Sequence, residues 1–247
     1  MATLITSGSS DVTLPDNTTV DVTIDSGATG ARRILIVQIT FRNSVALTVT
    51  GITYNGDALT SFGASVENLQ CSNQLWYLKA PDTGSNTLTI TTNDANNSAV
   101  AVVSWMVFSD VNQTTPYDGY TSNTGIDTTA ELTITSETGD TPFYTVSVRG
   151  LNPTAAAPTN YTERYENFNG NGIFATGGEG TGAASVAFVG TITATAMTSW
   201  VTLGANLNTD TGAGGSAVKT SNELAFASTK TYNELAIASR KTSNELA

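Results

Sequence analysis

The sequence predicts an all-β protein: a two-sheet antiparallel β-sandwich, jelly-roll or immunoglobulin-like, with an extended repetitive C-terminal tail. Short segments alternate between apolar and polar residues, which is the period of a half-buried strand. Turn-forming residues separate these segments at spacings of roughly 10 residues, as in sandwiches. Thr, Asn, Ser and Gly are abundant while Lys, Glu and Arg are scarce, a composition that disfavours helices.

The expected strands follow from these patterns in chain order. Residues 18–24 alternate, and residues 32–41 form a mostly apolar run that suits a central strand. Residues 47–54 alternate and end at Asn55-Gly56, a strong hairpin signal because both turn positions need a positive φ. Further strands are expected at 72–78, 86–92, 99–108, 131–135, 143–149, 185–195 and 198–203. Two packed antiparallel sheets accommodate these strands, and no helix is expected before residue 206.

Composition also divides the chain into domains. Residues 150–182 are irregular and rich in Asn and Gly, which predicts long surface loops at one end of the sandwich. Residues 206–216 (NLNTDTGAGGS) have the composition of a flexible linker. We therefore expect a sandwich body at 1–205, a Gly-rich linker at 206–216 and a repeat tail at 217–247.

Three motifs in the body carry a resemblance to a known family. They are YNGDAL at 54–59, LWYL at 75–78 followed by Pro81 and Gly84, and FSDVNQTTP at 108–116. In this order they resemble a β-sandwich domain of bacteriophage virion proteins and bacterial surface proteins of undefined activity. The resemblance covers roughly residues 15–205. It implies a structural or adhesive role and brings no catalytic residues, and the tail is not part of it.

The tail repeats itself every 11 positions. Residues 219–229 (KTSNELAFAST) are followed by 230–240 (KTYNELAIASR), and 241–247 (KTSNELA) begin a third copy. A fixed period means that one structural unit meets the same environment repeatedly. A row of identical subunits offers such an environment, so the tail predicts a self-assembling structural subunit that contacts copies of itself head to tail.

Two conformations of the tail compete. In a strand, the apolar side chains of each copy share one face, whereas in a helix the period of 11 gives a nearly straight apolar stripe. Each copy also holds a Thr-x-x-Glu capping pattern, and repeated caps inside one helix would conflict. We favour donated strands, because an all-β body offers exposed sheet edges. The anchors expected to be buried against a neighbour are Leu224, Phe226, Leu235, Ile237 and Leu246.

Charge and cysteine content limit the partners and the compartment. The formal charge is −11, and residues 219–247 carry four basic and three acidic groups, which leaves −12 on residues 1–218. An acidic body repels phosphates, which argues against nucleic acid and anionic membranes. No apolar run approaches a membrane span, and the lone Cys71 reads as a small buried hydrophobe. The N-terminus lacks a secretory signal pattern, so export would follow signal removal or lysis; we expect an extracellular protein.

Catalysis is not expected. The chain contains no histidine, which removes the commonest general base and the His-dependent triads and zinc sites. Paired carboxylates remain possible, as in glycosidases, and Glu163 and Glu166 lie among Tyr161, Tyr165 and Phe168. The ordinary interpretation of this cluster is a loop with aromatic anchors. The rival to self-assembly is a monomeric carbohydrate-binding or adhesin module with a repetitive anchor tail.

Cofactors are not expected. The one candidate is a structural calcium ion, because turn-like segments carry many oxygen ligands. These candidates do not have helix-loop-helix spacing, and Asx side chains at turns usually bond their own backbone. They are Asp82, Asn93, Asp94, Asp110, Asn112, Asp118, Asp127 and Asp210. Glycosylation sequons stand at Asn17, Asn96, Asn112 and Asn160.

Overall fold

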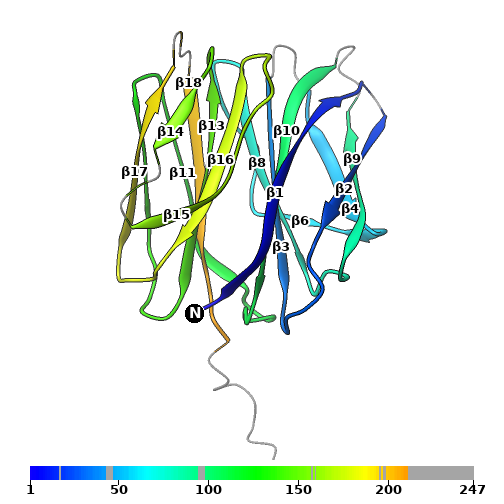
Figure 1. Cartoon of the computed structure of the whole chain (residues 1–247), viewed down its shortest axis with the longest axis vertical. Coiled ribbons are helices and arrows are strands. Elements are labelled where there is room, and N and C mark those ends of the chain that lie inside the picture. Colours follow the sequence, from blue (N-terminus) through cyan, green and yellow to red (C-terminus); the bar gives the residue numbers. More distant parts are fainter. Residues whose placement is uncertain are drawn as a thin grey trace, which may run out of the picture. The chain divides into compact units, whose positions relative to one another are not determined.

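The computed structural model describes residues 1–210, apart from 17, 43–46, 94–97, 157, 159, 195, 197 and 198. This part of the chain forms strands and no helix, and the strands pair antiparallel, so the predicted all-β antiparallel fold is confirmed. The number of sheets differs from the prediction, because the strands form four sheets rather than two. Figure 1 shows these sheets as successive layers.

The first half of the chain forms a sandwich of two sheets, which we call sandwich 1. Its inner sheet has the order β1 (Thr3–Leu14), β10 (Ala99–Ser109), β3 (Ile34–Arg42), β8 (Cys71–Lys79) and β6 (Thr60–Ser61), with β7 (Val66–Asn68) also paired to β8. Its outer sheet has the order β2 (Thr19–Asp25), β9 (Ser85–Thr92), β4 (Val49–Tyr54) and β5 (Asp57–Ala58).

The second half forms sandwich 2. Its inner sheet has the order β11 (Tyr117–Gly125), β18 (Ser199–Leu207), β13 (Thr141–Arg149), β16 (Ile173–Gly180) and β15 (Tyr161–Phe168). Its outer sheet has the order β12 (Thr129–Ile134), β17 (Val186–Thr193) and β14 (Thr154–Ala156).

The two sandwiches have the same topology. In each, the first strand pairs with the last, the last with the third, and the third with the third from last, β8 or β16. The second, penultimate and fourth strands form the outer sheet in both halves. This strand order is that of a jelly roll, so the fold is a tandem pair of jelly rolls.

The two inner sheets pack on each other, which explains why their central strands are buried along their length. In β3, Leu35 and Val37 point into the core of sandwich 1, while Ile34 and Ile36 point into a second core shared with sandwich 2. A third core lies between the two sheets of sandwich 2, around the stacked rings of Tyr144 and Phe188.

An approximate two-fold axis relates the sandwiches. β1 contacts β15, β10 contacts β16, β8 contacts β18, and β7 contacts β11. Under the shared topology, each of these contacts has its counterpart among the others, and β3 contacts its own counterpart β13. The interface therefore has the self-complementary form of a symmetric dimer interface, made within one chain.

The centre of this interface is polar. Gln38 donates to Asn73 at 3.1 Å and to Ser147 at 3.2 Å, and the Tyr165 hydroxyl donates to the Gln38 Oε1 at 2.7 Å. Asn73 donates in turn to Thr145 at 3.4 Å. Because these groups are buried, each hydrogen bond avoids the cost of an orphaned polar atom and restricts how the sheets fit together.

The region predicted as long surface loops, 150–182, instead contains β14, β15 and β16. Its glycines misled the sequence interpretation, because they mark close backbone approach rather than a loop. A Cβ at Gly177 would lie 2.3 Å from the Tyr165 hydroxyl, and one at Gly178 would lie 2.1 Å from the Thr162 carbonyl oxygen. The edge strands β1 and β11 were also missed, because they are largely polar.

Candidate functional site at the exit of the tail

The last described residues leave the body along the segment that connects the two sandwiches. β18 continues to Leu207, so Asn206 and Leu207, which the sequence assigned to the linker, are strand residues. Thr209 then forms an antiparallel bridge with Val111. Asn112 donates its N–H to the Asn208 carbonyl at 2.9 Å, and Asp210 donates to the Asp110 carbonyl at 3.0 Å. The exit is therefore attached to the connector by main-chain hydrogen bonds.

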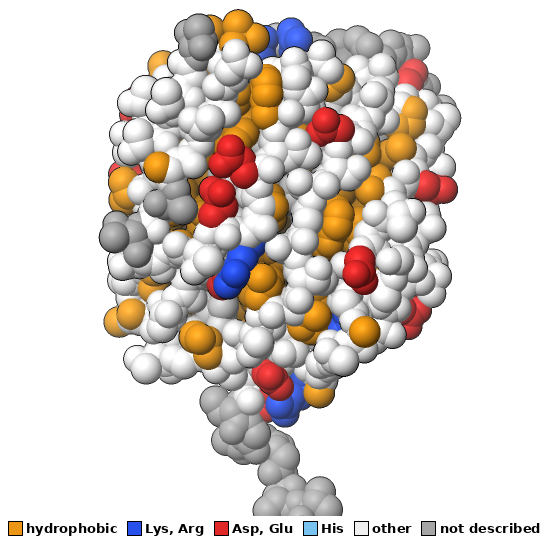
Figure 2. All heavy atoms as spheres, viewed as in Figure 1, with side chains coloured by type: hydrophobic (Ala, Val, Ile, Leu, Met, Phe, Trp, Pro, Cys, Tyr) orange, Lys and Arg blue, Asp and Glu red, His pale blue; other side chains and the backbone are white. Residues whose placement is uncertain are grey.

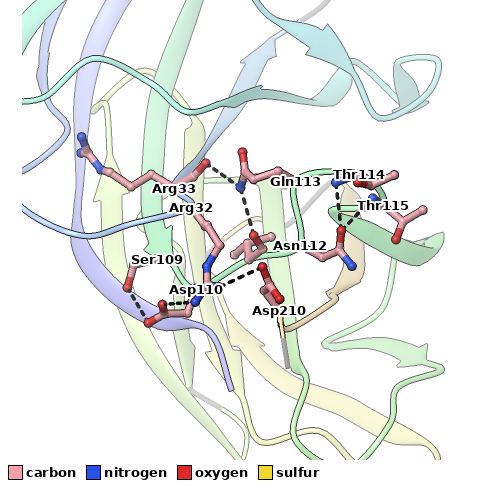
Figure 3. A network of polar contacts seen from close by, with 10 residues as sticks. Arg32, Arg33, Ser109, Asp110, Asn112, Gln113, Thr114, Thr115 and Asp210 are labelled. Carbon is pink, nitrogen blue, oxygen red and sulfur yellow. Dashed lines mark hydrogen bonds and ion pairs between the residues drawn. The ribbon is translucent and has the colours of Figure 1, made fainter. Parts of the chain in front are cut away.

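Arg32 joins this connector to the exit (Figure 3). Its Nη2 donates to Asp110 at 3.1 Å and its Nη1 donates to Asp210 at 3.0 Å. Hydrogen bonding to Asp110, together with the charge of Asp210, raises the pKa of the Arg32 guanidinium. All three side chains are partly exposed, so solvent screens both ion pairs and each adds little to stability. We call Arg32, Asp110 and Asp210 the exit clamp. The clamp positions the chain at the exit more than it adds stability.

Two residues of the clamp, Arg32 and Asp110, have unusual backbone conformations. Arg32 has a φ of 51° and Asp110 a φ of 61°, in the left-handed region that side chains other than glycine rarely adopt. The Asp110 N–H donates to the Ala31 carbonyl at 3.0 Å, and the Val111 N–H donates to the Arg32 carbonyl at 3.1 Å. These bonds hold the two strained residues together, and strain that is held in this way is a reason to look for function.

A second group of contacts lies around the buried Asn206. Its Nδ2 donates to Asp118 at 3.1 Å and to Asp140 at 3.0 Å, while its Oδ1 accepts from Ser136 at 2.7 Å. Asp140 also accepts the N–H of Thr209 at 2.8 Å. The side-chain amide thereby ties the end of β18 to strand β11 and to the loop between β12 and β13.

The acids around the exit bind the protein's own chain. Among the described residues, no group of three or more Cys, Asp or Glu side chains is arranged to hold a metal ion. The other calcium candidates lie apart and accept hydrogen bonds from the protein's own chain. Asp82 accepts from Asn55 at 2.7 Å, Asn93 from the Thr48 N–H at 2.7 Å, and Asp127 from the Thr129 N–H at 3.2 Å. Asp94 lies outside the described residues.

The Glu163 and Glu166 pair lies on β15, the edge strand of the inner sheet. Glu163 accepts a hydrogen bond from Thr176 at 3.0 Å, and partial burial, followed by the charge of Glu163, raises the pKa of Glu166. A bulge between Glu163 and Tyr165 changes which face each side chain meets. Tyr161 accordingly packs in the core of sandwich 2 while Tyr165 packs between the sandwiches. The nearby aromatic rings are core residues rather than an exposed platform for a sugar.

The remaining sequence candidates are distributed as follows. Asn112 is half-buried, and its Oδ1 accepts the N–H groups of Thr114 and Thr115 at 2.9 and 3.1 Å, so it closes a turn. Asn160 is exposed at the start of β15. Asn17, Asn96 and the tail anchors Leu224, Phe226, Leu235, Ile237 and Leu246 lie outside the described residues.

The exit clamp itself was not predicted. Asp110 and Asp210 were considered only as calcium ligands, and Arg32 only as the first residue of a strand. No local pattern links residues that lie 78 and 178 positions apart.

Comparison of the chain with models of known protein families, with characterised proteins and with solved structures gives no match. The resemblance to a virion and surface-protein domain therefore stays a prediction. Among the described residues, no helix has the length and apolarity to cross a membrane.

Proposed function

We propose that this protein is a structural subunit of an extracellular filament or virion-like assembly. The subunits polymerise through their C-terminal repeats, which dock as strands on neighbouring copies. The observation that carries this proposal is a repeat of 11 residues following a body whose last described residues are fixed by the clamp at Asp210.

The dimensions of the repeat support it. Eleven extended residues span about 36 Å at about 3.3 Å each. A compact body of some 210 residues has a radius of gyration near 17 Å and hence a diameter of about 43 Å. One repeat is thus about one subunit long, and successive repeats reach equivalent positions on successive neighbours.

The chemistry of the body is compatible with this role. Asp140 at the exit, Glu163 on β15 and Glu179 on β16 are engaged by neighbouring groups of the same chain. Jelly rolls build virus capsids and lectins alike, so the fold favours a structural or a carbohydrate-binding role without choosing between them. The repeats favour assembly, because a binding module has no need of identical strands at a fixed spacing.

Negative-stain microscopy of the purified full-length chain tests the proposal. Long regular fibres or closed shells are the expected result. Dispersed single particles at high protein concentration would contradict it and would favour the monomeric carbohydrate-binding or adhesin module instead.

A further inference from the structure

The two sandwiches differ at one edge of their outer sheets. In sandwich 1, β4 pairs with β9 from Thr92 to Leu88, and β5 adds a short fourth strand that pairs with the end of β4. In sandwich 2, β14 pairs with β17 only from Thr193 to Thr191, and the described residues form no fourth strand in the outer sheet. Among the described residues, the first half of β17, Val186–Gly190, has a partner on the β12 side alone.

A groove lies beside this half of β17. It has a volume of about 540 Å³ and is lined by Val186 and Ala187 on one side and by Asn160, Tyr161 and Thr162 on the other. A second hollow of about 330 Å³ shares Asn160, Thr162 and Thr181 with it and extends to the N-terminal residues of β1. The groove therefore opens between the two sheets of sandwich 2, beside the stretch of β17 that lacks a described partner.

Two tyrosine hydroxyls, one from a residue that lines the groove and one from the core beside it, lack hydrogen-bond partners among the described residues. The hydroxyl of Tyr161, whose side chain lines the groove and is 8% exposed, has no hydrogen-bond partner among the described residues. The hydroxyl of Tyr144, whose ring lies 5.0 Å from that of Tyr161, also has none. Buried hydroxyls are nearly always bonded, so both indicate an absent polar neighbour. Val186 lines the groove as an apolar residue and packs in the same core as Tyr144 and Tyr161.

We propose that this groove receives the C-terminal repeat of a second copy of the chain, added as a strand beside the Val186–Gly190 half of β17. The inference rests on the proposed function and names its docking site. Five unpaired positions match the length of Glu-Leu-Ala-Phe-Ala at 223–227 or Glu-Leu-Ala-Ile-Ala at 234–238. The alternation of these segments matches β17, whose side chains are buried and exposed in turn.

In this arrangement the two faces of the donated strand have separate roles. Leu224 and Phe226 of the neighbour's first repeat enter the groove against the inward-facing residues of β17. Its main chain bonds the free edge of β17, and its polar groups come within reach of the Tyr161 hydroxyl. Ala225 and Ala227 remain on the outer face, on the same side as the exposed Ala187.

The charge of the tail favours its binding to the body, and the number of repeats in the tail points to a neighbouring subunit as the source of the strand. Residues 219–247 carry a net +1 and residues 1–218 a net −12, so tail and body attract. Figure 2 shows acidic side chains spread over one face of the body. The unpaired stretch of β17 accommodates one added strand, yet the tail holds two full repeats and part of a third. The additional copies have a use only if they dock on other subunits.

Cysteine cross-linking in full-length protein tests the site. One chain carries Ala187→Cys, and a second, with a different affinity tag, carries Ala225→Cys and Ala236→Cys at equivalent positions of both full repeats. A strand paired with β17 places its opposite Cα within about 5.5 Å, inside the range of about 4.4–6.8 Å that a disulfide spans. A second donor with Ala227→Cys and Ala238→Cys covers the alternative register. The chains are co-expressed and mildly oxidised.

The matched control is Thr133→Cys. Thr133 lies on β12, opposite Ala187 of β17, and is exposed on the same face, one strand farther from the groove. We expect a mixed-tag disulfide dimer with Ala187→Cys, and only background with Thr133→Cys. Fibres without the Ala187 cross-link, in either register, would overturn the docking site and leave the proposed function intact.

Two further outcomes are decisive. A cross-link that forms only when Ala187→Cys and the tail cysteines are in the same chain, and leaves it monomeric, would show that the groove binds its own tail. That result overturns the inference. Absence of both fibres and cross-link from all variants, with none from the native chain either, would contradict the proposed function itself.

Discussion

The hydroxyl oxygens of Thr40 and Ser147 lie 2.5 Å apart, and each residue is the seventh in its nine-residue strand, β3 or β13. The contact therefore joins topologically equivalent positions of the two jelly rolls. It places the approximate two-fold axis close to this pair and inside a buried polar cluster. The interface between the sandwiches thus depends on hydrogen bonds as well as on apolar packing.

Gln38→Ala tests the importance of this cluster for stability. The change removes the acceptor of the Tyr165 hydroxyl and the donor to Asn73 and Ser147. Each buried group left without a partner costs about 1–3 kcal/mol, so the free energy of unfolding falls by at least that amount. Denaturant unfolding measures the loss. Thr23→Ala, on an exposed position of β2, is the control and changes stability little.

Removal of residues 217–247 is expected to leave a folded body that does not assemble. The described strands end at Leu207, and the contacts of the exit end at Asp210, so the deleted segment lies beyond them. A retained cooperative thermal transition, together with loss of fibres in the microscope, is the expected pair of results. Loss of the cooperative transition would show that the tail belongs to the fold.

Substitution of the tail anchors Leu235 and Ile237 by Asp is expected to abolish assembly without unfolding the body. Each apolar side chain contributes about 1.5–3 kcal/mol when fully buried, and a carboxylate in the same place adds a desolvation cost. Sedimentation and microscopy give the readout. Replacement of Lys230 by Gln in the same repeat is a milder control. Intact fibres from the double Asp variant would mean that assembly uses body surfaces instead.

Cys71 is expected to resist thiol reagents in the folded protein. Complete burial raises the pKa of its thiol from 9.0 to about 12, and Arg149 only partly opposes this. The folded state therefore holds the proton more tightly than the unfolded state. The resulting stabilisation is present below pH 9 and is lost as the pH rises towards 12. Comparison of unfolding free energies for the native chain and Cys71→Ala across this range isolates the effect. Rapid labelling at pH 8 without denaturant would contradict it.

Polysaccharide turnover is expected to be absent, because no histidine is available and the aromatic residues near Glu163 and Glu166 are core residues. A screen against a panel of glycans measures this, with Glu163→Gln and Glu166→Gln as paired variants. Activity that is lost on either substitution would replace the structural interpretation with a glycosidase.

Local pattern was sufficient for much of the fold. The apolar run at residues 32–41 predicts a central strand, and β3 lies within its sheet between β10 and β8 and is covered by other sheets on either face. Asn55 and Gly56 predict a tight turn, and both have positive φ. The lone Cys71 is buried, as its strand-like surroundings indicate.

The glycine-rich stretch of β16 shows where pattern reasoning failed. Gly177, Gly178 and Gly180 lack the side chains that reveal alternation, and the residues packed against this stretch show why glycine is needed there. The Tyr165 hydroxyl and the Thr162 backbone occupy the space that side chains would need. A residue chosen for what packs against it carries no periodic signal of its own.

The sequence by itself determined the all-β class, most strand positions in the first half and the repeat that motivates the proposed assembly, because strand alternation and repeat period are local properties. Only the tertiary structure decided that the body is two jelly rolls, that Arg32 joins Asp110 to Asp210, and that Val186–Gly190 of β17 pair on one side only among the described residues. These features depend on contacts between residues far apart in the chain. The pairing of distant strands is set by how whole sheets bury their faces, which no short segment encodes.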